Sequence, residues 1–452
     1  MSPRLYLAPQ LRLRQLLPQA RFVHAEEIVF RGFECSPQRC GSEDLLVWLG
    51  SDVAEGFPQQ LPPPGAVAGV LTPQELPHWK GPQCVVPDVW EALGQVAQAV
   101  AGWPAQALQL VGVWGSGLRG AAAQLIHRVL GTAGIATGLV GPASADEDHL
   151  PCSPRSGSFC SPQMAQWLAR IRQSGCTHAV VQVPGSQPPQ RALAGLELDV
   201  LCITGAANRL AQAQQLLQFL RPEGVLVVAA EEPAARKLLD SWDGPALTVG
   251  LGTQWEVGAT VLEEHPGEQT FLIHAGWESI PVRTRWLGAD YVRACLLATA
   301  VGLVHQFRLP AIARGLESLD GIPGCMEAVC LGQQFPVLLF WPEAARCPSV
   351  IRSWRKVTAG RMHRIRWQPQ AAWELLSDAG EDPPAVLSWG GLREIRRTAQ
   401  CWDELAAALD QVEAGDLAVI ELPEDLSPQQ LARLRECLQT WLLHSPGQRL
   451  AA

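Results

Sequence analysis

Residues 108–137 constrain the fold more than any other stretch of this sequence, because they form the pattern of a strand, a glycine-rich turn and a helix. An apolar run at 109–113 precedes the turn at 115–120, and small and apolar residues continue from Ala121. A turn of this kind presents backbone N–H groups and a helix N-terminus to an anion. The pattern therefore predicts the scaffold of a phosphate-binding loop.

The side chains of this loop do not supply the chemistry of nucleotide hydrolysis. A hydrolytic loop needs a lysine to reach the β- and γ-phosphates and a hydroxyl to hold Mg²⁺. Arg119 stands at the lysine position and Gly120 at the hydroxyl position. The residues that remain as candidates for contact with an anion are Gly115, Ser116, Gly117, Arg119 and Gly120.

Two other interpretations of the turn stay open on local grounds. Gly115, Gly117 and Gly120 also satisfy the dinucleotide-binding pattern G-x-G-x-x-G, which requires an acid at the end of the next strand. The next strand is expected at 135–140, and the nearest acids, at 146–148, follow it inside an expected loop. The third interpretation is a tight turn that binds no ligand.

Composition excludes several classes of protein. The 452 residues are 47% hydrophobic and 17% charged, which is typical of a globular chain of more than one domain. A net charge of −9 without a basic run argues against nucleic-acid binding, and no apolar stretch is long enough for a membrane span.

The N-terminus lacks the features of a signal peptide, so we expect a cytoplasmic protein. The 13 cysteines include no C-x-x-C pair, so we expect reduced thiols and no metal site.

Strands and helices alternate along most of the chain, which indicates a helix-covered and largely parallel sheet. We predict three α/β domains with boundaries near residues 94 and 322, so that the domains are 1–94, 95–322 and 323–452. The main strands are expected at 109–113, 178–183, 199–204, 224–229, 336–340 and 416–421, and helices at 162–175, 208–220, 287–306 and from 428.

Taken in order, several segments resemble the Mur ligase family, in particular the type that adds the third amino acid to a UDP-muramoyl dipeptide. The similar segments are CGSEDLLVWL (40–49), VGVWGSGLRGAAAQLIHRVLGTAGIATGLVG (111–141), SGCTHAVVQVPGSQ (174–187), LAGLELDVLCITGAA (193–207) and RGLESLDGIPGCMEAVCLGQQFPVLLF (314–340). Each segment alone is a weak signal, but their shared order covers more than 300 residues.

The resemblance implies a UDP-precursor-binding-like first domain, a central ATPase-like domain with a phosphate loop on a parallel sheet, and a Rossmann-like third domain. It also implies an ATP-dependent reaction in which a carboxylate is phosphorylated and then attacked by an amine, with Mg²⁺ as cofactor. Such a reaction depends on cations that stabilise the transferring phosphoryl group.

This sequence departs from the family at the positions that carry that chemistry. Besides Arg119 and Gly120 in the loop, the amino-acid-selecting D-N-P-R motif is reduced to Ser-Asp-Ala-Gly at 377–380. At the other such positions this chain has a different residue from the family. Gln182 stands in place of a metal-binding glutamate, Ser186 in place of a histidine, Ala213 in place of a carbamylated lysine and Tyr291 in place of an asparagine. Phe340 and Glu343 lie where the family has the D-Y-A-H-T-P segment.

These losses predict a catalytically inactive, Mur-ligase-like binding or regulatory protein of peptidoglycan precursor synthesis. Its partner would be a UDP-muramoyl precursor or a protein of cell-wall synthesis. We assign no catalytic residue, no metal and no required cofactor, and expect any ATP to bind weakly through the loop backbone with little effect of Mg²⁺. The alternatives are a divergent ATP-dependent amide-forming ligase and, with less support, a dinucleotide-binding oxidoreductase.

Overall fold

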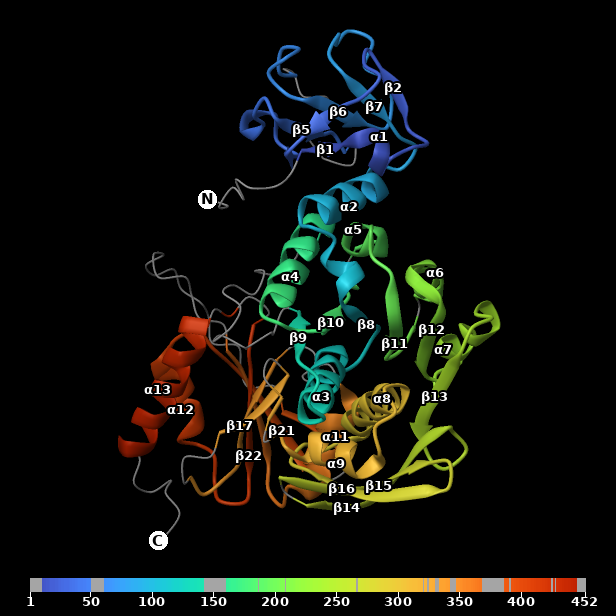
Figure 1. The fold of residues 1–452 in the computed structure, drawn as a ribbon. Coiled ribbons are helices and arrows are strands. Elements are labelled where there is room, and N and C mark those ends of the chain that lie inside the picture. The colour runs from blue at the N-terminus through green and yellow to red at the C-terminus, as the bar shows by residue number, and fades with distance from the viewer. Residues whose placement is uncertain are drawn as a thin grey trace.

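The structure is a computed structural model of the 452-residue chain. It describes residues 10–444 except 50–60, 142–159, 186, 208, 266, 320, 323–324, 330–332, 342–346, 368–385, 390–391, 424–425 and 427. The chain is a mixed α/β protein whose described strands form three main sheets, which follow one another along the chain (Figure 1).

The first sheet lies at the N-terminal end of the molecule and has the described strand order β2-β7-β6-β5-β4 (Figure 1). Its strands are β2 (Arg21–Val23), β4 (Gly32–Glu34), β5 (Asp44–Val47), β6 (Gly69–Thr72) and β7 (Gln83–Val85). The short strands β1 (Leu11–Arg12) and β3 (Val29–Phe30) pair beside it, and α1 (Leu13–Leu16) follows β1. Helix α2 (Val89–Val100) leads from this sheet to the next, so the boundary predicted at residue 94 falls inside a helix.

The central sheet has the described strand order β16-β15-β14-β13-β12-β11-β8-β10-β9. Its strands are β8 (Gln109–Trp114), β9 (Thr137–Val140), β10 (His178–Gln182), β11 (Leu198–Ile203), β12 (Leu220–Ala229), β13 (Ala246–Leu251), β14 (Val257–His265), β15 (Glu268–Ala275) and β16 (Glu278–Thr284). The strands from β8 to β13 pair in parallel, whereas β14, β15 and β16 pair antiparallel to one another.

Helices cover both faces of the central sheet, as the alternation of strands and helices predicts. They are α3 (Arg119–Thr132), α4 (Ser161–Gln173), α5 (Pro189–Leu193), α6 (Leu210–Leu216), α7 (Pro233–Arg236), α8 (Ala289–Val304) and α9 (Leu309–Glu317). Successive residues of β8 point into different cores, with Val111 and Val113 in one and Leu110 and Trp114 in the other. Burial on both faces explains why the parallel strands are continuous apolar runs.

The third sheet has the described strand order β17-β18-β22-β19-β21-β20. Its elements are β17 (Met326–Val329), β18 (Val337–Phe340), α11 (Pro348–Val357), β19 (Met362–Trp367), β20 (Val386–Trp389), β21 (Leu392–Ala399), α12 (Trp402–Leu409), β22 (Leu417–Glu421) and α13 (Pro428–His444). One apolar core runs without interruption from the central sheet into this sheet, and includes Leu338, Val350 and Leu417.

The expected strands and most of the expected helices are present within a few residues of the predicted bounds. The helix predicted at 208–220 is wrong in length, because α6 ends at Leu216 and Leu220 already belongs to β12, where it pairs with Leu198. Its apolar spacing continues past the helix because Leu216, Phe219 and Leu220 are all buried in the same core.

Candidate functional site

The predicted strand, turn and helix are confirmed, because β8 ends at Trp114 and α3 begins at Arg119. Gly115 and Gly117 have φ angles of 137° and 81°, in the region that favours glycine. A Cβ atom placed on Gly115 would lie 2.5 Å from the carbonyl oxygen of Gly205. Backbone shape therefore accounts for both glycines without a ligand, and at Gly115 a close neighbour adds to it.

The segment after β11 holds the first half of the loop. The Ser116 N–H donates to the Gly205 carbonyl across 3.1 Å, and the Thr204 hydroxyl donates to the Ser116 carbonyl across 2.6 Å. The backbone of this segment thus lies directly against the turn. One amide that was expected to face an anion, that of Ser116, is already bonded within the protein.

A carboxylate that sequence analysis missed lies at the same place. Glu232 accepts the N–H of Ala206 across 2.7 Å, and a Cβ on Gly205 would lie 2.9 Å from the Glu232 carboxylate and 2.5 Å from the Ser116 hydroxyl. The negative charge opposes an anion at the loop. Its position three residues after the end of β12 is a signal that could have identified it, because the carboxyl ends of parallel strands share one edge of the sheet.

Two arginines lie at the segment that follows β10. Arg119 donates from Nη1 to the Val183 carbonyl across 3.1 Å, and Arg209 donates from Nη1 to the Gly185 carbonyl across 2.9 Å. A Cβ on Gly185 would lie 3.6 Å from the first Nη1 atom and 2.7 Å from the second. The two cations therefore flank one short stretch of backbone beside the loop. Arg209 was not singled out by sequence analysis, and nothing in its local sequence marks it.

The positions that sequence analysis compared with metal ligands do not form a metal site. Gln182 ends β10, pairs in register with Val113 and is 6% exposed, so it lies beside the loop but brings only a neutral amide. Ala213 is buried in α6 within an apolar core, and Ser186 lies outside the described residues. No three His, Cys, Asp or Glu side chains of the described part of the chain gather as metal ligands.

Mg²⁺, which the resemblance implies, does not fit this arrangement. A hard dication takes carboxylate, carbonyl, hydroxyl or water oxygens. The loop offers glycine at the hydroxyl position and Gln182 at the carboxylate position. The Glu232 carboxylate lies nearby but already accepts the Ala206 N–H, and the guanidinium groups of Arg119 and Arg209 outnumber it. Two cations beside the site would repel a third.

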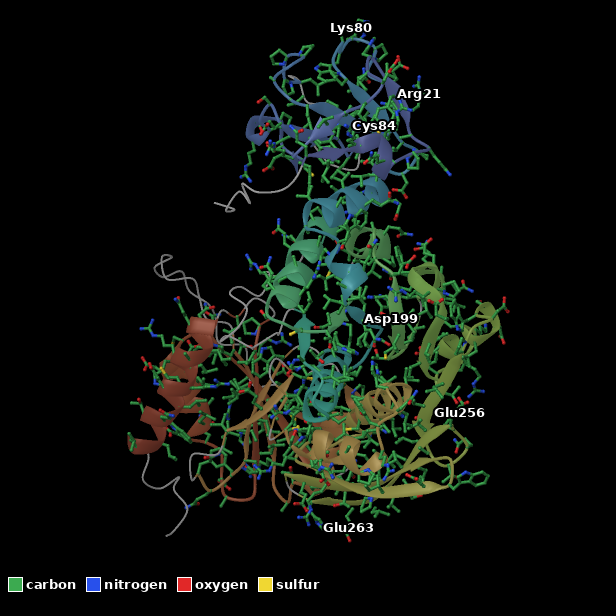
Figure 2. The ribbon with its side chains drawn as sticks, viewed as in Figure 1. Arg21, Lys80, Cys84, Asp199, Glu256 and Glu263 are labelled. Atoms are coloured by element: carbon green, nitrogen blue, oxygen red, sulfur yellow. The ribbon has the colours of Figure 1, made fainter. Side chains whose placement is uncertain are left out.

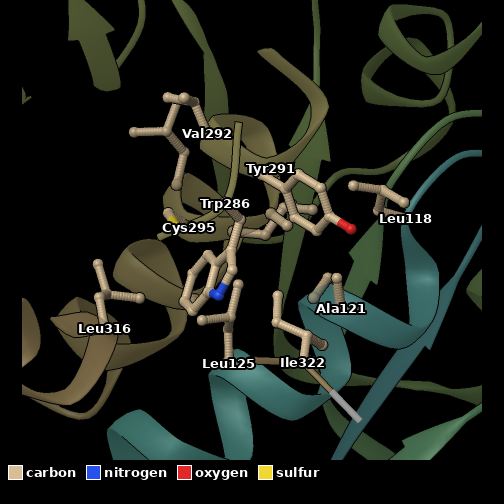
Figure 3. Packing of buried hydrophobic residues seen from close by; sticks show 14 of the residues in the cluster. Leu118, Ala121, Leu125, Trp286, Tyr291, Val292, Cys295, Leu316 and Ile322 are labelled. Atoms are coloured by element: carbon tan, nitrogen blue, oxygen red, sulfur yellow. The ribbon is translucent and has the colours of Figure 1, made fainter. Parts of the chain in front are cut away.

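Apolar side chains close the loop on the side of α8. Leu118, 3% exposed, belongs to the same buried core as Ala121, Trp286, Tyr291 and Ile322, and Figure 3 shows the Tyr291 ring between Leu118 and Trp286. The Tyr291 hydroxyl also lies 3.6 Å from the Cys325 sulfur. This tyrosine therefore fills space at a position where the family has a smaller amide.

The D-Y-A-H-T-P position is filled in the same way. Phe340, at the end of β18, is 1% exposed and belongs to the core that contains Leu118 and Tyr291. Glu343 lies outside the described residues. Tyr291 in α8 and Phe340 in β18 are thus parts of a packed interior.

An ion-pair network connects the ends of the central strands to α8. Arg293 binds both carboxylate oxygens of Glu231, at 3.1 and 2.7 Å, and one oxygen of Asp290 at 2.7 Å. Burial raises the pKa of Glu231, but the bonds from Arg293 and from the Leu251 N–H outweigh it and hold that pKa below its usual range. Asp290 also accepts the Ser349 hydroxyl of α11, so the network reaches the third sheet.

The strand order argues against the dinucleotide interpretation. In a dinucleotide-binding fold the glycine-rich strand lies beside the next strand, whose terminal acid binds the ribose. Here β8 lies between β10 and β11, and β9 pairs with β10 instead. The acids at 146–148 lie outside the described residues.

Sequence relatives are similar to the chain over part of its length. A UDP-N-acetylmuramoyl-L-alanyl-D-glutamate–2,6-diaminopimelate ligase of Corynebacterium efficiens is 26% identical over 298 residues, which cover 62% of this chain and 56% of that protein. The corresponding ligase of Thermosynechococcus vestitus is 26% identical over 349 residues, covering 71% and 69%. A UDP-N-acetylmuramyl-tripeptide synthetase of Roseiflexus is 25% identical over 306 residues, covering 61% and 60%. No family model matches the chain.

Solved structures of the same kind share the fold over nearly the whole chain. A UDP-N-acetylmuramoyl-L-alanyl-D-glutamate–2,6-diaminopimelate ligase superposes with a TM-score of 0.66 at 14% identity, covering 96% of this chain and 99% of that one. The MurF ligase of Thermotoga maritima in complex with ADP gives 0.58 at 13% identity, covering 91% and 98%. The chain therefore has the Mur ligase fold and resembles the Mur ligase family, with MurE-type tripeptide synthetases among its sequence relatives.

Proposed function

We propose that this protein is a Mur-ligase-like protein that has lost ligation and acts by binding in peptidoglycan precursor synthesis. Its ligand would be a UDP-muramoyl precursor or a protein partner of that pathway. It would be located in the cytoplasm, where such precursors are made. Among the described residues, none of the helices combines the length and apolar character that crossing a bilayer requires.

The observation that carries this proposal is that Leu118 of the loop and Tyr291 of α8 lie in one buried apolar core. In the resembled family this region receives a nucleotide, and here both side chains are almost completely buried. Arg119 supports the same conclusion, because its guanidinium is bonded to Val183 rather than presented as a lysine-like point charge.

The proposal is tested by turnover and by binding on the full chain. We expect no phosphate release from ATP with UDP-muramoyl dipeptide and diaminopimelate. Turnover on the order of 1 s⁻¹, at the low end of ordinary enzymes, would contradict the proposal. Calorimetry with UDP-muramoyl dipeptide should give binding without ATP if the precursor is the ligand, whereas absence of binding directs the search to a protein partner.

The divergent ligase remains a second candidate because Glu232 lies beside the Ser116 hydroxyl. A ligase with rebuilt chemistry would use this carboxylate to hold Mg²⁺. Under our proposal Glu232 only repels anions, and a like charge a few ångströms away costs on the order of 1–4 kcal/mol between the dielectric of water and that of a protein surface.

Glu232→Gln separates the two functions, because the amide oxygen of glutamine can still accept the Ala206 N–H. We expect the substitution to tighten ADP binding, by about tenfold, equally with and without Mg²⁺. Loss of a Mg²⁺-dependent ADP affinity in the same variant would support the ligase. Glu256→Gln, a substitution of a carboxylate that instead bonds Thr248, is the matched control.

A further inference from the structure

Strand β14 has a free edge along its second half. It pairs with β13 only from Val257 to Ala259, whereas it pairs with β15 as far as His265. In the described part of the chain no other strand pairs with the outer edge of residues 260–265. Such an edge presents unpaired N–H and C=O groups that can add another strand.

Two of the exposed side chains on this part of β14 are large and apolar, beside the exposed polar residues Thr260, Glu263 and His265. Val261 is 37% exposed and Leu262 is 51% exposed, and both are among the large hydrophobic side chains that the described surface leaves in contact with water. The β14–β15 register shifts between Val261 and Glu263, so that Leu262 is an extra residue at a bulge. Figure 2 shows Glu263 at the base of the molecule, on the outer side of the strand.

Helix α11 borders the free edge and turns it into a groove. Ser353 and Lys356 donate to the Glu264 carboxylate across 2.8 and 3.0 Å, which ties the helix to β14. A cavity of about 360 Å³ lies between them, lined by residues 261–264 of β14, by Ala289 and by four residues of α11, namely Ser349, Arg352, Ser353 and Lys356.

Two of the charged side chains in the groove pair with each other, because Lys356 lies 3.0 Å from Glu264. Glu263, which is exposed, lies 3.5 Å from His265 and forms an ion pair only when that histidine is protonated. Arg352 is exposed and forms no ion pair with any residue that the structure describes. The lining therefore combines unpaired backbone groups, two apolar side chains and a guanidinium that suits a carboxylate.

The shape of the groove favours a single extended segment of polypeptide as its ligand. A groove between a strand edge and a helix accepts a single extended segment, whose backbone pairs with the edge and whose alternate side chains contact the lining. The edge of a second copy would carry its own α11 alongside and would meet the first helix.

We propose that this groove binds an extended segment of a partner protein, with an acidic side chain on Arg352 and apolar side chains on Val261 and Leu262. The proposal does not depend on the loss of ligation, since the groove lies at β14 and α11 and uses no residue of the phosphate loop.

One substitution removes the backbone pairing without removing the strand. The Ala259 carbonyl accepts the Gly252 N–H, so the polar groups of Ala259 face the edge away from β15, and those of Val261, two residues on, face the same edge. Val261→Pro deletes that N–H at an edge position, where proline is tolerated. Val261→Ile keeps the N–H and an apolar, β-branched side chain, and is the matched control.

The experiment selects phage-displayed random dodecapeptides on the full chain and measures the affinity of enriched peptides by fluorescence polarisation. Enriched peptides should carry a carboxylate and alternating apolar residues. Val261→Pro and Arg352→Glu should each weaken binding at least tenfold. Val261→Ile, and Arg433→Glu on the exposed face of α13, should leave it within twofold. Thermal unfolding checks that each variant is folded. If Val261→Pro does not fold, Arg352→Glu still tests the proposal.

Three outcomes would overturn the proposal. The first is selection without enriched peptides, and the second is enrichment of peptides whose affinity is unchanged by Arg352→Glu in a folded variant. The third is concentration-dependent self-association, seen by light scattering and abolished by Val261→Pro, which would identify a second copy as the occupant.

Discussion

Arg119 donates from Nη1 to the Val183 carbonyl across 3.1 Å, so the residue at the lysine position of the loop is directed to the strand beside it. The bond joins the first residue of α3 to the segment that follows β10. A guanidinium held on backbone in this way positions the two segments relative to each other, and the loop loses the mobile point charge that phosphoryl transfer uses.

Restoring the two loop residues should therefore not restore activity. In Arg119→Lys with Gly120→Thr, the lysine and hydroxyl return, but Gln182, Ala213 and the packed Tyr291 remain. We expect no ATP-dependent phosphate release above that of the unmodified protein, measured with UDP-muramoyl dipeptide and diaminopimelate. Turnover in this double variant would show that the loop residues alone had silenced the site.

Gly115→Ala should destabilise the protein strongly. The residue has a φ of 137°, and the new Cβ would lie 2.5 Å from the Gly205 carbonyl oxygen. Backbone strain and this clash together should cost more than about 2 kcal/mol, seen as a lower midpoint of urea unfolding.

Gly131→Ala is the matched control in the helix that follows. Gly131 lies in α3, is exposed, and has open space around its Cβ position. Alanine is the better helix former, so this variant should gain about 0.5–1 kcal/mol. A Gly115→Ala protein as stable as the unmodified chain would show that the Thr204–Gly205 segment does not hold the loop.

Tyr291→Asn, which returns the family's residue, should destabilise the protein rather than rebuild a nucleotide site. It removes a ring that is 1% exposed and leaves an amide in an apolar core, a loss of about 3 kcal/mol or more in unfolding free energy. Tyr291→Phe, which deletes only the hydroxyl beside Cys325, should lose less than about 1 kcal/mol. Tight, Mg²⁺-dependent ADP binding by the asparagine variant would mean that the space is open to ligand.

Acid should weaken the protein through His178. Burial lowers the pKa of His178, the neighbouring His305 ring lowers it further, and Asp199 opposes both. The unfolded chain therefore protonates His178 more readily than the folded chain does. The contribution of neutral His178 to the free energy of unfolding is complete above the ordinary pKa of about 6.5 and is lost as pH falls below it. The loss is about 1.4 kcal/mol per unit of pKa difference between the two states.

Urea unfolding between pH 5 and pH 8 measures this contribution by comparison of variants. His178→Gln should flatten the decline at low pH, whereas the exposed-residue variant His78→Gln should decline as the unmodified protein does. An unchanged pH dependence in His178→Gln would assign the acid sensitivity to other groups.

Local sequence patterns determined the elements of the site. The glycine-rich turn between an apolar strand and a small-residue helix was predictable, because β8, the turn and α3 depend on neighbouring residues and on the φ angles that Gly115 and Gly117 supply. The order of similar segments likewise predicted the fold. The helix predicted to Leu220 was too long because tertiary pairing with Leu198 overrode its local spacing.

Only the tertiary structure decided what surrounds the loop. Glu232, Arg209 and the Gly205 backbone reach it from connections after β11 and β12, and Tyr291, from a helix far along the chain, shares the buried core of Leu118. The groove beside α11 has the same origin, because β14 belongs to the central sheet and α11 follows the third sheet's second strand. Residue types and spacing specify hydrogen bonds within a turn or a helix, whereas contacts between distant segments arise only when the sheets and their cores pack.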